Sequence, residues 1–202
     1  MNVKISELKP KTMQVCIVDA QNDFINGSMA VKGAEEKVNN IIKFLKEHAD
    51  EIDTIVITLD WHPYDHSSFK DNGGKWPRHC VKYTEGAALY QPLADTIGEL
   101  VSKNDIDVYF VKKGSNKFEE EYGAFDYNKN KDGLTTDCYF LIDEPIVLCG
   151  LVGDYCVSHT ARNLISQGYR VKFYLDGIAN IDDGNILNTF IQFEENRNRL
   201  TI

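Results

Sequence analysis

The chain has 202 residues, of which 43% are hydrophobic and 26% charged, and these values predict one globular domain over residues 1–202. With 22 Lys and Arg against 31 Asp and Glu, the net charge is −9, which argues against a nucleic-acid partner. No apolar run reaches the length of a membrane span, and residues 1–14 contain no apolar segment of a secretory signal. We therefore expect a cytoplasmic protein without a membrane partner, whose five cysteines are reduced thiols.

Short apolar runs alternate with stretches of helical periodicity along the chain. The predicted elements, in chain order, are a strand at 13–18, a helix at 33–48, strands at 54–59, 107–111 and 145–149, a helix at 157–166, a strand at 170–175 and a helix at 183–193. Buried strands that alternate with helices predict a three-layer, Rossmann-like α/β fold, in which helices cover both faces of a mainly parallel sheet. Two long polar connections, residues 60–92 and 113–133, are expected to be functional loops.

Polar or reactive side chains follow four of the predicted strands. Asp19 comes after the first strand and Asp60 after the second. Lys112 and Lys113 follow the third strand, and Cys156 lies beyond the fourth. Because ligands of open α/β sheets bind at the carboxyl ends of the strands, we expect an active site at this edge.

Cys156 is the candidate nucleophile, because it follows the glycine-rich turn GLVGDYC and precedes a predicted helix. The amides and the dipole of a helix N-terminus stabilise a thiolate, and they can also bind an oxyanion. Asp19 is the candidate base, whereas His159 has no second element to orient it and is interpreted as structural. Only one of Lys112 and Lys113 can point at the site, and the alternation along the strand leaves open which one does.

A second group of side chains has the spacing of metal ligands. Asp60 and His62 point the same way in an extended segment, and His79 returns from the following loop. Two imidazoles and a carboxylate suit one divalent transition metal ion, such as Zn²⁺, Fe²⁺ or Mn²⁺. We expect His66 to form hydrogen bonds in the loop or to face solvent, and Cys80 to be a packed thiol.

Aromatic residues gather in the same loops, at Phe24, Trp61, Trp76 and Tyr122. A flat apolar slot between such side chains suits an aromatic ring. Ordinary packing of the loops would explain the same residues, so the pattern alone leaves the two interpretations open.

Several stretches occur together in one order along the chain: VDAQNDF, DWHPYDHSSF, WPRHCV, EGAAL, KKG, EYGAF and GLVGDYCVSHTA. With these motifs the chain resembles the cysteine hydrolases of the isochorismatase-like superfamily and, within it, the nicotinamidases. The resemblance implies the isochorismatase-like hydrolase fold.

The resemblance also implies the catalytic roles of the candidate residues. It implies a catalytic triad of Asp19, Lys113 and Cys156, which assigns the lysine role to the residue directly before the glycine. It further implies a cis peptide bond between Leu151 and Val152. The backbone N–H groups of Val152 and Cys156 would then form the oxyanion hole.

The metal and the substrate ring are assigned in the same way. The resemblance implies that Asp60, His62 and His79 hold the metal. It implies that the ring of the substrate is walled by Phe24, Trp76 and Tyr122.

The activity implied is the hydrolysis of nicotinamide to nicotinic acid and ammonia through a cysteine thioester, in NAD salvage, without an organic cofactor. The alternatives are a cysteine hydrolase of another small amide (pyrazinamide-like, ureide or carbamoyl), isochorismatase itself, and an inactive relic that only binds. Isochorismatase would leave Cys156 and the metal ligands without a purpose, and a Rossmann-type nucleotide binder would need a GxGxxG turn, which VDAQNDFING lacks. The sequence leaves open whether the chain forms a homo-oligomer.

Overall fold

The fold is built on one five-stranded sheet. A computed structural model of the chain describes residues 13–126, 136–182, 187–188 and 190–192. The strands are β1 (Met13–Val18), β2 (Ile52–Asp60), β3 (Asp107–Lys113), β4 (Ile146–Gly150) and β5 (Val171–Ile178). Their order in the sheet is β3-β2-β1-β4-β5, and every neighbouring pair is parallel. The predicted parallel sheet is therefore confirmed, and a single domain over residues 1–202 stays a prediction.

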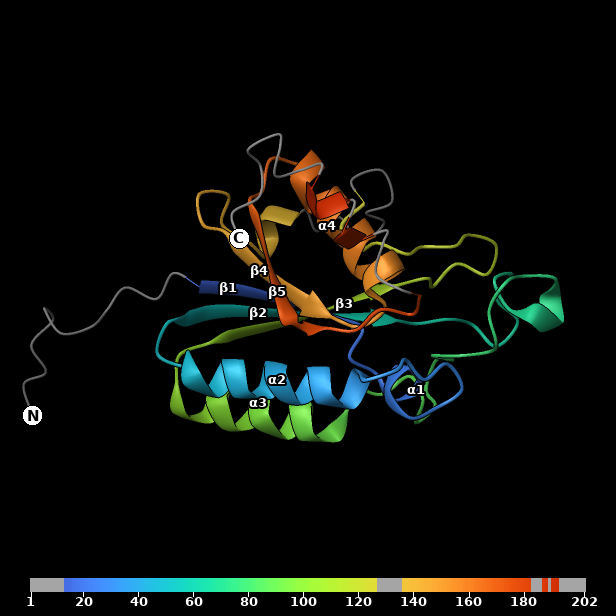
Figure 1. The fold of residues 1–202 in the computed structure, drawn as a ribbon, viewed down its shortest axis with the longest axis horizontal. Coiled ribbons are helices and arrows are strands. Elements are labelled where there is room, and N and C mark those ends of the chain that lie inside the picture. Colours follow the sequence, from blue (N-terminus) through green and yellow to red (C-terminus); the bar gives the residue numbers. More distant parts are fainter. Residues whose placement is uncertain (1–12, 127–135, 183–186, 189, 193–202) are drawn as a thin grey trace, which may run out of the picture.

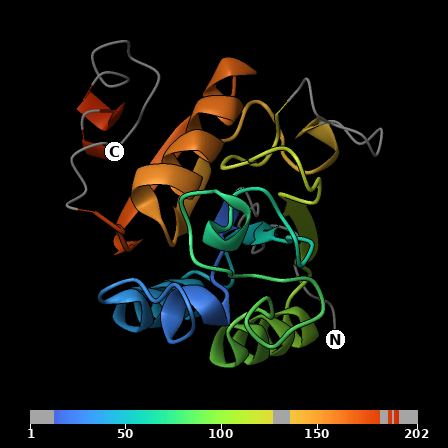
Figure 2. The same ribbon diagram turned by 90° about the vertical axis from the view of Figure 1, so that its right-hand side faces the viewer.

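Helices cover both faces of the sheet, which confirms the predicted three layers. Helices α2 (Ala34–Glu47) and α3 (Gln91–Lys103) lie on one face, and α4 (Ser158–Ser166) lies on the other (Figures 1 and 2). Shorter helical turns are α1 (Asn22–Ile25), η2 (Lys70–Asn72), η3 (Thr136–Cys138) and the π-type turn η4 (Gly153–Val157). In the part of the chain that the structure describes, no helix is both long and apolar enough to cross a membrane.

The apolar pattern of each strand follows from its place in the sheet. The central strand β1 is buried at every residue after its first, because helices cover it on both sides. The edge strand β3 alternates more, and Phe110 and Lys112 are exposed on it. Lys113, the last residue of β3, is buried again, where the strand reaches the carboxyl-end edge of the sheet.

Most predicted elements agree with the structure to within a few residues. Two elements that were not predicted, α3 and η4, are informative. Helix α3 was not predicted, although Leu93, Ile97 and Leu100 are buried on one face of it at helical spacing. The helix predicted to begin at residue 157 is preceded by the π-type turn that contains Cys156. Of the final predicted helix, residues 187–188 and 190–192 are helical, and the remainder lies outside the described residues.

Gly150 ends β4 and brings it against the end of β1. Its φ is 130°, and a Cβ atom at this position would lie 2.1 Å from the carbonyl oxygen of Val18. The next residue, Leu151, donates its N–H to the same oxygen at 2.8 Å. Only glycine allows this close approach, which places the turn after β4 beside the residue that follows β1.

Gly150→Ala is expected to lower the free energy of unfolding by about 2–4 kcal/mol, because the backbone must shift to remove the contact. Urea unfolding would measure the change. The matched control is Gly98→Ala in α3, where the added Cβ meets nothing within 4 Å. This control should gain about 0.5–1 kcal/mol from the better helix former. Equal effects of the two substitutions would contradict the steric argument.

Candidate active site

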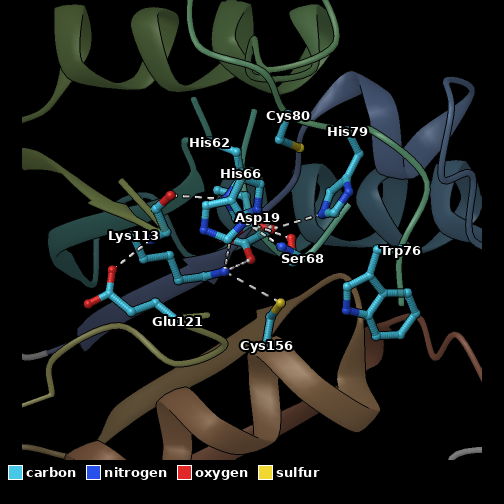
Figure 3. A network of polar contacts seen from close by, with 12 residues as sticks. Asp19, His62, His66, Ser68, Trp76, His79, Cys80, Lys113, Glu121 and Cys156 are labelled. Atoms are coloured by element: carbon cyan, nitrogen blue, oxygen red, sulfur yellow. Dashed lines mark hydrogen bonds and ion pairs between the residues drawn. The ribbon is translucent and has the colours of Figure 1, made fainter. Parts of the chain in front are cut away.

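The structure brings the four strand-end residues together at one edge of the sheet. Asp19 lies one residue beyond β1, and Asp60 and Lys113 are the last residues of β2 and β3. Cys156 lies in η4, between β4 and α4. All four are buried, with at most 4% of each residue exposed. Figure 3 shows Asp19, Lys113 and Cys156 pointing toward one another.

The ammonium group of Lys113 is the centre of this cluster. Its Nζ lies 2.6 Å from Asp19 Oδ2, 2.5 Å from Asp60 Oδ1 and 3.4 Å from Cys156 Sγ (Figure 3). A carboxylate oxygen of Asp19 and one of Asp60 lie within 4.8 Å of the sulfur and of each other. Two buried carboxylates so close together need a cation between them, and Lys113 supplies it.

The structure decides between the two adjacent lysines. Asp60 pairs with Lys113 across β2 and β3, so the two side chains leave the sheet at the same level. Lys112 is exposed, and its Nζ lies 4.4 Å from the centre of the Trp61 ring. The site lysine is therefore Lys113.

The pKa values of the cluster follow from burial and from Lys113. Burial alone would lower the pKa of Lys113, but the two carboxylates outweigh it and hold this pKa well above its usual range. Burial raises the pKa of Asp60, yet Lys113 and His62 outweigh it and hold that carboxyl well below its usual pKa. Lys113 is therefore an ammonium ion and Asp60 a carboxylate.

At Asp19 and Cys156 burial outweighs Lys113, and the pKa values of both groups are raised. Burial raises the pKa of Asp19, and Lys113 offsets this only in part. Burial likewise raises the pKa of the Cys156 thiol well above its usual value, in spite of Lys113. Burial therefore outweighs the positive charge near the sulfur and favours the neutral thiol in the resting site. A neutral thiol needs a base, and Asp19 is hydrogen-bonded to it.

Two polar side chains hold Asp19 and Asp60 in place, and sequence reasoning missed both. Thr58 Oγ1 donates to Asp19 Oδ1 at 2.7 Å, from inside β2. The amide group of Gln21 accepts from the backbone N–H of Asp60 and donates to its carbonyl, both at 2.8 Å. Gln21 lies within a quoted motif and could have been found, whereas Thr58 looks like any strand residue.

The turn that carries Cys156 is strained at Val152. This residue has a φ of 58°, in the left-handed region that a β-branched side chain rarely adopts. The expected cis bond between Leu151 and Val152 is wrong, because the described residues contain no cis peptide bond. The left-handed conformation reverses the chain instead. The N–H of Val152 donates no hydrogen bond within the described residues, so it is free to bind an oxyanion.

Asp60, His62 and His79 form a compact set of metal-ligand atoms. The Nε2 atoms of His62 and His79 lie 3.3 and 3.5 Å from Asp60 Oδ2. Their Nδ1 atoms bond to the carbonyl oxygens of Gly114 at 3.0 Å and Pro77 at 2.8 Å. These bonds orient both rings and leave Nε2 directed at the carboxylate. The donor set and its orientation fit a divalent transition metal ion.

His66 and Cys80 lie beside these three residues and have other contacts. His66 is buried, with Nδ1 at 2.7 Å from Ser68 Oγ and Nε2 at 3.1 Å from the carbonyl oxygen of Glu119. It therefore forms hydrogen bonds in the loop, as predicted, and supports His62 by ring packing. Cys80 is a buried thiol, and burial raises its pKa well above the usual value. The prediction of a packed thiol agrees with this.

A hollow of about 250 Å³ opens above the sulfur of Cys156. The three predicted aromatic side chains line it, and Trp76 donates its indole N–H to the Tyr122 hydroxyl at 3.1 Å. The side chains that line the hollow are Phe24, Met29, Asp60, Trp76, His79, Glu120, Tyr122, Val152, Tyr155 and Cys156.

One of the four aromatic residues that gather in the loops lies outside the hollow, and sequence reasoning missed another that lines it. Trp61 does not line the hollow and packs against Tyr83, at a ring distance of 5.5 Å. Tyr155 lines it and packs edge-on against Trp76 at 5.1 Å. Its position directly before Cys156 was the available signal.

Helix α4 follows the turn that carries Cys156 and also contacts the Tyr122 loop. A Cβ atom at Gly123 would lie 2.7 Å from the carbonyl carbon of His159, so the loop lies directly on the helix. Asn163 donates to the carbonyl oxygen of Ala124 at 2.8 Å. The ring of His159 packs on Tyr122 at 5.3 Å, and burial lowers its pKa. His159 is thus part of the packing, which agrees with its structural interpretation.

Lys113→Ala is expected to destabilise the protein by about 3–5 kcal/mol, because it leaves two buried carboxylates without a cation. The control is Lys112→Ala, which removes one exposed cation–π contact and should cost less than about 1 kcal/mol. Urea unfolding of both variants at pH 8 would measure the difference. If the two midpoints coincide, Lys113 does not hold the cluster together.

Comparisons with known proteins agree with this geometry. The family model described as the isochorismatase domain matches residues 13–192. The nicotinamidase of Saccharomyces cerevisiae is 30% identical to this chain over 201 residues, covering 85% of this chain and 90% of that protein.

Solved structures share the fold over almost the whole chain. The pyrazinamidase of Pyrococcus horikoshii in complex with zinc superimposes with a TM-score of 0.72 at 25% identity, covering 95% of this chain and 98% of that one. The PnC1 protein of L. infantum in complex with nicotinate gives a TM-score of 0.73 at 27% identity, covering 96% and 94%. This chain therefore belongs to the isochorismatase family and, within it, groups with the nicotinamidases.

Proposed function

We propose that this protein is an amidohydrolase that converts nicotinamide to nicotinic acid and ammonia, a step of NAD salvage. The observation that carries the proposal is the position of Cys156 Sγ, 3.4 Å from a buried ammonium group and at the floor of an aromatic-lined hollow. The nicotinamidase relative supports the choice of substrate. The bound nicotinate in the L. infantum structure supports it as well, because nicotinate is the product of this reaction.

The first half of the reaction forms a thioester. Phe24, Trp76 and Tyr122 hold the flat ring in the hollow, so that the carboxamide faces the sulfur. Asp19 takes the thiol proton while Cys156 attacks the carboxamide carbon, which yields a tetrahedral oxyanion. The N–H groups of Val152 and Cys156 donate to that oxyanion.

The carboxyl group of Asp19 transfers the protons in both thioester formation and thioester hydrolysis. Asp19 passes its proton to the nitrogen as the carbon–nitrogen bond breaks, and ammonia leaves. Asp19 then takes a proton from water, which attacks the thioester. When the carbon–sulfur bond breaks, the proton returns to the sulfur and nicotinic acid is released. Lys113 stays charged throughout and compensates the negative charge that moves between Asp19 and Cys156.

Asp60, His62 and His79 would hold one divalent transition metal ion, of which zinc, iron and manganese all suit the donor set. Such an ion would supply Lewis-acid coordination to the nitrogen of the pyridine ring and would help to orient the ring. The zinc in the P. horikoshii pyrazinamidase supports a metal at this site.

A second candidate substrate is pyrazinamide, because the P. horikoshii protein is a pyrazinamidase and the aromatic side chains that line the hollow suit any flat ring. Ureides and carbamoyl compounds lack a ring and would leave the aromatic walls unused. An inactive relic has no need of the ion pairs between Lys113 and the two carboxylates. The cytoplasmic location and the oligomeric state stay predictions.

Cys156→Ala is expected to lower ammonia release from nicotinamide by roughly 10³-fold or more, because no other group can form the thioester. The control is Cys138→Ser, since Cys138 is an exposed thiol outside the hollow. An ammonia assay over nicotinamide, pyrazinamide and small aliphatic amides would compare the variants. Full activity of Cys156→Ala would refute the proposal.

Removal of the metal by a chelator is expected to raise KM for nicotinamide by about 10-fold or more, and added zinc or manganese should restore it. His79→Ala should reproduce this loss without rescue, because one of the three ligands is missing. His48→Ala, at the opposite end of the sheet, is the matched control. If exhaustive chelation leaves KM unchanged, the metal has no part in binding.

A further inference from the structure

Glu121 is a carboxylate that the reaction does not use, and it is bound to the backbone of the site. Its Oε2 accepts the N–H of Gly114 at 2.7 Å (Figure 3). Gly114 directly follows Lys113, and Tyr122 directly follows Glu121. The carboxylate therefore joins the end of β3 to the loop that walls the hollow.

The two peptide groups of Gly114 connect to both Lys113 and His62. The peptide that contains its N–H also contains the carbonyl of Lys113, which accepts the N–H of Trp61 at 2.9 Å. The carbonyl of Gly114 itself accepts the Nδ1–H of His62 at 3.0 Å. One glycine thus sets the direction of the site lysine and the orientation of a metal-ligand ring.

Gly114 cannot be stiffened by a side chain of its own. Its φ is 66°, and a Cβ atom would lie 2.4 Å from Cε1 of His62. Glycine is also the residue with the greatest backbone freedom, so this turn needs an external contact to stay in one conformation. The half-buried side chain of Glu121 provides that contact by accepting the hydrogen bond from the Gly114 N–H.

We propose that Glu121 is a positioning residue, which holds the Gly114 turn so that Lys113 and His62 keep their places together. The proposal rests on the metal site of the proposed function. Glu121 acts by accepting a hydrogen bond, and its charge is not required. Loss of a group that orients a metal ligand typically weakens metal binding by about 10–100-fold, which sets the size of the expected effect.

The experiment compares Glu121→Ala, Glu121→Gln and Glu121→Asp with the wild-type chain. Glu36→Ala, an exposed glutamate on α2, is the matched control. The dissociation constant for zinc alone is measured by competition with a chromophoric chelator, and kcat for nicotinamide is measured at saturating zinc. Circular dichroism and a thermal midpoint establish that each variant is folded.

We expect Glu121→Ala to weaken zinc binding by about 10–100-fold and to lower kcat at saturating zinc, because His62 and Lys113 both lose their fixed turn. Glu121→Gln keeps an acceptor oxygen at the same reach and should stay within about 3-fold of wild type. Glu121→Asp is one methylene too short and should resemble Glu121→Ala, which provides a second test if the alanine variant does not fold.

Two results would overturn the proposal. One is wild-type zinc affinity and kcat in Glu121→Ala, and the other is a Glu121→Gln variant as impaired as Glu121→Ala, which would make the charge responsible. A wild-type chain that binds no zinc would instead refute the metal site of the proposed function. Glu121 would then be judged by kcat alone, through the position of Lys113.

Discussion

A buried ammonium group between two carboxylates and a thiol is the interaction on which this structure depends. Lys113 contacts Asp19, Asp60 and Cys156, and none of these groups is solvated. Charges held in so little water interact strongly, so their arrangement fixes which group carries a proton. The result is a charged lysine, an ionised Asp60 and a neutral thiol beside a carboxyl group of raised pKa.

The parallel sheet makes this arrangement possible. Three neighbouring strands end at the same level, and each delivers one side chain of the cluster. The fourth group arrives on the turn after β4, which Gly150 brings against β1. The proposed metal ligands and the proposed catalytic groups are then in direct contact, because one oxygen of Asp60 faces Lys113 and the other faces the two histidines.

Much of this was predictable from the sequence, because strand ends and motif residues are local features. Asp19, Lys113 and Cys156 each follow a recognisable apolar run, and the structure brings them together as expected. What the sequence could not supply is the contacts between elements. Thr58 has the appearance of an ordinary strand residue, and the left-handed turn at Val152 follows from packing that no local pattern records. Helix α3 was missed for another reason, since its apolar pattern was present but residues 93–106 were assigned to no element.

The position of β3 at the edge of the sheet has a consequence for the local stability of the protein. A rim strand has a neighbour on one side only, so it frays more readily than a central strand. Here the ion pairs of Lys113 fasten the last residue of that strand to the two strands beyond it. Loss of these ion pairs is therefore expected to loosen the end of the edge strand as well as the proposed active site.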